Sequence, residues 1–89
     1  MKLRVEHHCI ETAARKEYRR VQALLLGLEE STPQFLENAQ SLTLLENFLR
    51  KTDFSELRTK RPELSGGRIL EVDLVEGDGP DEFELRENK

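Results

Sequence analysis

Apolar and polar residues alternate at the start of the chain. Leu3, Val5 and His7 are separated by charged residues, and this period of two is typical of a strand that has one buried face. The pattern predicts a strand over residues 1–8.

From residue 10 the apolar residues recur every three or four positions, which is the spacing of one helical face. The residues that share this face are Ile10, Ala14, Val21, Leu24, Leu25 and Leu28. The pattern therefore predicts a helix over residues 11–28, with these side chains directed at the core.

The start signal of a second helix follows. Ser31 and Gln34 fit a capping box, and Pro33 stands in the first turn, where its missing N–H costs nothing. The helix is predicted over residues 33–51. Its wide apolar face contains Phe35, Leu36, Ala39, Leu42, Leu45 and Leu49.

A short third helix is predicted over residues 54–60. Thr52 and Asp53 interrupt the preceding pattern and suit the capping position of a new helix. Pro62 disfavours helical geometry in the residue before it, so the third helix should end there.

Period-two alternation returns in the last quarter of the chain. Strands are predicted over residues 69–76 and 82–87, with Gly, Asp and Pro between them, so they should form a β-hairpin. An isolated hairpin is marginally stable in water, and we expect the N-terminal strand to join it. The predicted fold class is α+β, a single domain over residues 1–89 in the order β-α-α-α-β-β. An antiparallel helical hairpin and the short third helix pack on this small sheet.

Composition limits what such a domain can do. A chain of 89 residues buries only about 60 % of its unfolded surface, so its core is thin. An enclosed substrate pocket would take up most of that core, which argues against a deep active site within one protomer and leaves a site shared between two protomers open. The sequence contains no catalytic or cofactor motif, and we expect neither an enzyme nor a bound cofactor. No apolar run approaches the ~18–20 residues of a membrane span. Cys9 is the single cysteine, which favours a reducing compartment, and we expect the cytoplasm.

Charge is unevenly distributed along the chain. Residues 1–68 hold twelve basic and ten acidic residues, whereas residues 69–89 hold two basic and eight acidic ones. The C-terminal hairpin is therefore acidic and the rest slightly basic. An asymmetry of this kind influences partner choice and encounter rate.

Metal-ligand residue types gather in His7, His8 and Cys9. On a strand, His7 and Cys9 point to one side and His8 to the other, so at most two of them could bind one ion. Zinc requires three or four ligands. The favoured interpretation is a strand-to-helix junction without a metal.

Two carboxylates, Glu17 and Glu46, fall within the apolar faces of the first two helices. In an antiparallel hairpin they lie at nearly the same level, where facing carboxylates share a proton, bind a cation or pair with bases. A metal site with His7 or His8 is one hypothesis. Ion pairs within each helix, to Arg20 and to Arg50, are the favoured one.

A basic band runs along the first helix, and it consists of Arg15, Lys16, Arg19 and Arg20. Such a band can track nucleic-acid phosphates, so nucleic-acid binding is an alternative function. The acidic C-terminal hairpin would repel nucleic acid, and no aromatic residues are interleaved for base stacking. A solvated helix face is the more frequent explanation.

Leu44 and Phe48 form a second apolar patch on the second helix, nearly opposite Phe35. A helix that is apolar on two sides is covered on two sides. Either Phe54 and Leu57 of the third helix cover this patch, or another molecule does.

The leading prediction is a small non-enzymatic cytoplasmic protein, of the regulator, adaptor or inhibitor type, that acts through protein–protein contacts and self-associates, with a homodimer as one possible form. Its contact regions are the acidic hairpin and the surface of Leu44, Phe48 and Leu26.

Overall fold

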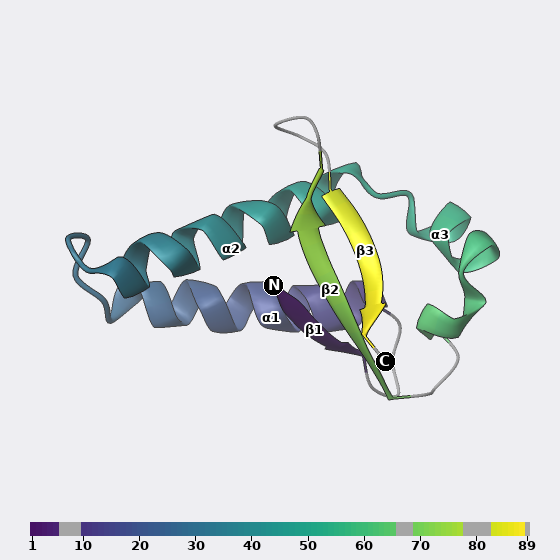
Figure 1. Cartoon of the computed structure of the whole chain (residues 1–89), viewed down its shortest axis with the longest axis horizontal. Helices are drawn as coiled ribbons and strands as arrows, with labels where there is room; N and C mark the ends of the chain where they lie inside the picture. Colours follow the sequence, from purple (N-terminus) through teal and green to yellow (C-terminus); the bar gives the residue numbers. More distant parts are fainter. Residues whose placement is uncertain (6–9, 66–68, 78–82, 89) are drawn as a thin grey trace.

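The computed structural model describes residues 1–5, 10–65, 69–77 and 83–88 (Figure 1). Its elements follow the predicted order, with one added turn of 3-10 helix, η1. They are β1 (Lys2–Val5), α1 (Ile10–Leu26), α2 (Pro33–Lys51), α3 (Phe54–Lys60), η1 (Pro62–Ser65), β2 (Leu70–Glu76) and β3 (Phe83–Asn88). The predicted α+β class and element order are confirmed.

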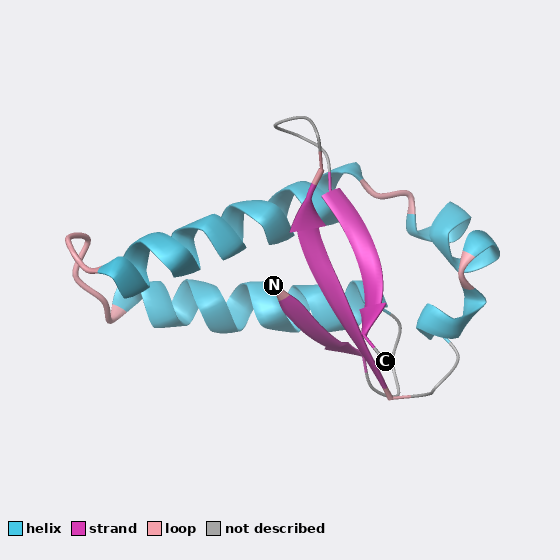
Figure 2. Ribbon diagram, in the orientation of Figure 1, coloured by secondary structure: helices cyan, strands magenta, loops and turns pink. Residues whose placement is uncertain are grey.

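The three strands form one antiparallel sheet in the order β1-β2-β3, so the N-terminal strand does join the C-terminal hairpin. Leu3, Val72 and Leu74 are buried, while Lys2 and Glu71 on the opposite face are exposed. The helices therefore cover one face of the sheet, and Figure 2 shows the strands as a layer against the helical hairpin. This is the two-layer arrangement expected of a small α+β domain.

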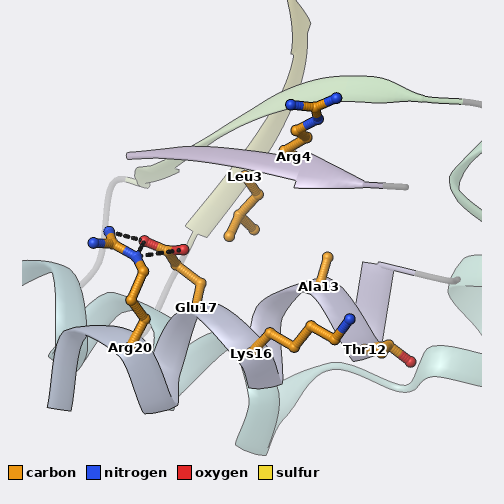
Figure 3. Close-up of a pocket in the computed structure, with 7 residues that line it drawn as sticks. All are labelled: Leu3, Arg4, Thr12, Ala13, Lys16, Glu17 and Arg20. Atoms are coloured by element: carbon orange, nitrogen blue, oxygen red, sulfur yellow. Dashed lines mark hydrogen bonds and ion pairs between the residues drawn. The ribbon is translucent and has the colours of Figure 1, made fainter. Parts of the chain in front are cut away.

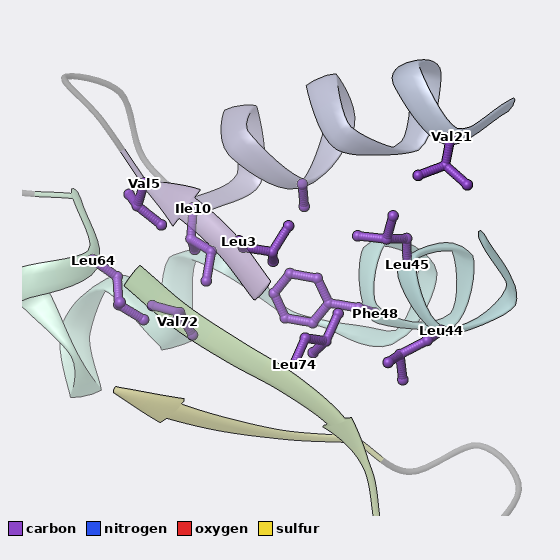
Figure 4. Packing of buried hydrophobic residues seen from close by; sticks show 11 residues of the cluster. Leu3, Val5, Ile10, Val21, Leu44, Leu45, Phe48, Leu64, Val72 and Leu74 are labelled. Carbon is purple, nitrogen blue, oxygen red and sulfur yellow. The ribbon is translucent and has the colours of Figure 1, made fainter. Parts of the chain in front are cut away.

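Phe48 is at the centre of the core and is fully buried (Figure 4). Its ring meets the rings of Phe54 and Phe83 edge to face, at centroid distances of 5.5 and 5.0 Å. Leu44 on the same side of α2 retains only 8 % of its exposure. The prediction that Leu44 and Phe48 form an exposed contact surface is therefore wrong. α3 covers part of that patch, as one alternative had it, and the sheet covers most of the rest.

The apolar faces predicted for the two long helices are buried over only part of their length. Leu36 is 60 % exposed and Leu24 is 41 % exposed, although both were expected to face the core. Both belong to the turn end of the hairpin, because α1 ends at Leu26 and α2 begins at Pro33. This end of the hairpin extends beyond the sheet (Figure 1). α2 is about 28 Å long at 1.5 Å per residue, whereas three strands spaced ~4.8 Å apart make a much narrower layer.

The helix ends follow local rules, with two corrections. The N-cap of α2 is Thr32, not Ser31: its Oγ1 accepts a hydrogen bond from the Phe35 N–H at 3.2 Å. Asp53 caps α3 as predicted, accepting from two backbone N–H groups. α1 ends at Leu26 rather than residue 28, because the chain tightens into three-residue turns at Gly27 and Leu28.

No residue between 22 and 43 is buried. We call this segment, which contains the end of α1, the connecting turn and the first half of α2, the distal arm. The rest of the two helices, residues 10–21 and 44–51, is the sheet-covered end. The molecule measures 41 × 28 × 24 Å, and its longest dimension runs along the helical hairpin (Figure 1).

Candidate functional site

The predicted metal ligands do not assemble in the described part of the chain. His7, His8 and Cys9 lie outside the described residues. Glu46 is exposed, and Glu17 is half-buried and pairs with a base of its own helix. Among the residues that the structure describes, no three His, Cys, Asp or Glu side chains are grouped closely enough to hold a metal ion.

Glu17 forms an ion pair with Arg20, which lies three residues later on α1. The Arg20 Nε is 3.0 and 3.1 Å from the two carboxylate oxygens, and Nη2 donates to Oε1 as well. Hydrogen bonding to Glu17, together with its negative charge, raises the pKa of Arg20 above its ordinary value. The favoured hypothesis for Glu17 is thus confirmed. Arg50 instead donates to Asn47 Oδ1 at 3.0 Å.

The basic band of α1 is partly neutralised by its own helix. Arg15 pairs with Glu11 at 3.0 Å and Arg20 pairs with Glu17. Lys16 and Arg19 are exposed, and neither makes an ion pair with a described residue. A band with two of its four cations engaged retains little charge for a run of phosphates, because each neutralised phosphate requires its own cation.

A cleft of about 240 Å³ lies between β1 and α1 (Figure 3). The residues that line it are Leu3, Arg4, Thr12, Ala13, Lys16, Glu17 and Arg20. Leu3 points from the strand toward the helix, and the Glu17–Arg20 pair closes one end. The cleft is apolar at its floor and charged at its rim, so it suits an elongated ligand with both kinds of group.

The second candidate surface is the distal arm. Leu26 is 88 % exposed there, and Leu24 and Leu36 are the other large apolar side chains that reach the solvent. Only three of the arm's 22 residues are charged, against 29 of the other 67. All three are glutamates: Glu29, Glu30 and Glu37. Depletion of charge combined with exposed apolar side chains is the composition of protein contact surfaces.

Sequence reasoning identified parts of both surfaces. Lys16 and Arg20 were selected for their charge and Leu26 for its position outside the core face of α1. Leu24 and Leu36 were assigned to the core, so the arm was missed as a unit. Its low charge content was visible in the sequence and could have revealed it.

Comparison with known proteins found a matching protein family and a similar protein. A protein-family model matches residues 1–86. A protein of Archaeoglobus fulgidus, described as an uncharacterized protein, is 45 % identical over 71 residues, which are 79 % of each chain. No solved structure matches. Within the described residues, no helix is long and apolar enough to cross a membrane.

Proposed function

The chain belongs to the family whose model spans residues 1–86, and for this member we propose a non-enzymatic function in the cytoplasm, carried out through protein–protein contacts. The contact surface is the distal arm, and the first partner is a second copy of the same chain. This assignment moves the predicted contact from Leu44 and Phe48, which are buried, to the arm that carries Leu26.

One observation carries the proposal: the arm exposes leucines where the rest of the surface exposes charge. Leu26 and Leu36 retain 88 % and 60 % of their exposure. Covering such side chains stabilises an association by about 1.5–3 kcal/mol for each fully buried leucine. A helical hairpin that lacks a covering layer corresponds to half of a four-helix bundle. The hairpin of a second copy would supply the other half.

Charge favours a second copy in an antiparallel arrangement. Glu29 and Glu30 lie at the tip of the arm, and Arg19 lies on α1 near its base. When two arms pack side by side in opposite directions, the tip of each one meets the base of the other. The acidic tips then approach basic helix faces, and the contact is isologous and closed.

The test is the molar mass in solution, measured by size-exclusion chromatography with light scattering over a range of protein concentrations. We expect a dimer that dissociates on dilution. The double variant Leu26→Gln, Leu36→Gln should raise the dissociation constant about a hundredfold or more.

Ile69→Gln is the matched control, because Ile69 is 58 % exposed and lies outside the arm. It should leave the dissociation constant unchanged. A monomer at millimolar concentration would overturn the proposal, and so would an equal effect of Ile69→Gln and the double variant.

A further inference from the structure

β1 is an edge strand, and its outer edge borders the cleft against α1. β2 pairs with the other edge of β1. Met1 and Leu74 exchange two backbone hydrogen bonds, at 2.7 and 2.9 Å. Bonding alternates along an antiparallel pair, so Leu3 and Val5 continue this ladder and the backbone groups of Lys2 point the other way, toward the cleft side.

The cleft has the length of a short strand. Its helical wall runs from Thr12 to Arg20 along one side of α1, a rise of about 12 Å over eight residues. The four residues of β1 extend over ~13 Å. A fourth strand laid along β1 would therefore be flanked by α1 over its whole length. This is the geometry of strand addition, in which an extended peptide lies between a sheet edge and a helix.

β2 indicates which side chains such a strand carries. It pairs with β1 so that Asp73 faces Lys2 and Glu71 faces Arg4 on the open side of the sheet. On the core side, Val72 faces Leu3. Cross-strand pairs of this kind stabilise a sheet by opposite charge and by apolar contact. Because a strand shows the same side chains to both neighbours, the outer edge of β1 favours the same alternation.

We propose that the cleft between β1 and α1 binds an extended peptide segment of a partner protein, with acidic residues alternating with apolar ones, by strand addition to β1. The apolar side chains of the segment lie on Leu3 and Ala13. Its acidic side chains lie on the open side of the sheet, next to Lys2, and Lys16 on the helical wall receives a further carboxylate. The charge of Arg20 is balanced by Glu17, which leaves Lys16 as the cation of this wall.

A second copy of β1 does not fit the same edge. Antiparallel pairing of two β1 strands that keeps both apolar faces on the core side sets Leu3 opposite Leu3 and Lys2 opposite Arg4. Like charges directly opposite one another destabilise a sheet. The proposed site is thus distinct from the self-association surface on the distal arm, and each can fail without the other.

The probe is a synthetic heptapeptide with the sequence of β2, Leu70–Glu76, blocked at both ends and titrated into ¹⁵N-labelled full-length protein. We expect amide shifts confined to β1 and to residues 12–20 of α1, with an affinity that falls as salt rises. A peptide with lysine at its three acidic positions should bind at least about tenfold more weakly. A peptide that is N-methylated at alternate residues, on the edge that would face β1, should not bind.

The protein variants compare two exposed cations of α1. Lys16→Glu should weaken binding of the acidic peptide about tenfold. Arg19→Glu, an equal charge reversal on the same helix but outside the cleft lining, should have little effect. Equal effects of the two variants, equal binding of the lysine peptide, undiminished binding of the N-methylated peptide, or no shifts at millimolar peptide would each overturn the proposal.

Discussion

The same two helices meet different conditions at their two ends. In the sheet-covered end, α1 and α2 bury Ala14, Val21, Leu45 and Phe48 against each other and the strands. In the distal arm the sheet covers little of the helix surface, and no residue is buried. An apolar face is therefore not sufficient for burial: a third layer has to be present to cover it.

Charge follows the same division. The arm has three charged residues among 22, and the remainder of the chain has 29 among 67. A helix surface that stays in water usually carries charge, since charged side chains keep proteins soluble and apart. The arm has few such charged side chains, and its leucines are exposed to the solvent. The comparison indicates that the sheet-covered end supplies stability and that the arm is available for contact.

The largest expected effect comes from breaking the core of the sheet-covered end. Phe48→Ala should lower the free energy of unfolding by about 3–5 kcal/mol, because a fully buried ring is lost and a cavity remains. Leu36→Ala, on the same helix in the arm, should change it by less than about 0.5 kcal/mol in dilute monomeric protein. Urea denaturation monitored by circular dichroism measures both values. Similar losses for the two variants would contradict the division.

Hydrogen exchange sharpens the comparison within α2 alone. In the Leu26→Gln, Leu36→Gln variant, amide protons of residues 37–43 should exchange at least about tenfold faster than those of residues 45–51, because local openings are easier where few apolar contacts hold the backbone. Exchange followed by NMR gives each rate. Uniform protection along α2 would show that the two halves open as one unit. Restored protection in concentrated wild-type protein would support the arm as the self-association surface.

A smaller effect is expected at the start of α2. Thr32→Ala should cost about 1 kcal/mol, because the hydroxyl no longer caps the Phe35 N–H. Ser31→Ala, one position earlier, should lie within about 0.5 kcal/mol of the wild type. The two variants are compared by thermal denaturation at equal concentration. A larger loss for Ser31→Ala would restore the capping box that the sequence suggested.

Much of the local structure could be read from the sequence because it depends on neighbours in the chain. The bounds of α2 and α3 agree with the predictions, since Pro33, Asp53 and Pro62 act on the residues beside them. The N-cap of α2 is Thr32 and not the predicted Ser31. Both residue types can fill that position, and the path of the backbone decides which one does. The pairing of the N-terminal strand followed from the instability of an isolated hairpin.

The candidate sites were predictable only in part. Lys16, Arg20 and Leu26 were selected from charge and helical position, which are local properties. The cleft itself requires β1 to lie beside α1 at the edge of the sheet, and that depends on the strand order. Leu44 and Phe48 were assigned to a contact surface because helical periodicity cannot tell which of two apolar faces the sheet covers.

The sequence by itself determined the elements, their order, the α+β class and the uneven distribution of charge, because propensity, capping and periodicity act over a few residues. The tertiary structure decided which apolar residues are core. Phe48 is buried and Leu36 is exposed because a three-stranded sheet covers only one end of a longer pair of helices. The length of helix left uncovered depends on how the two layers cross, and periodicity carries no information about that crossing.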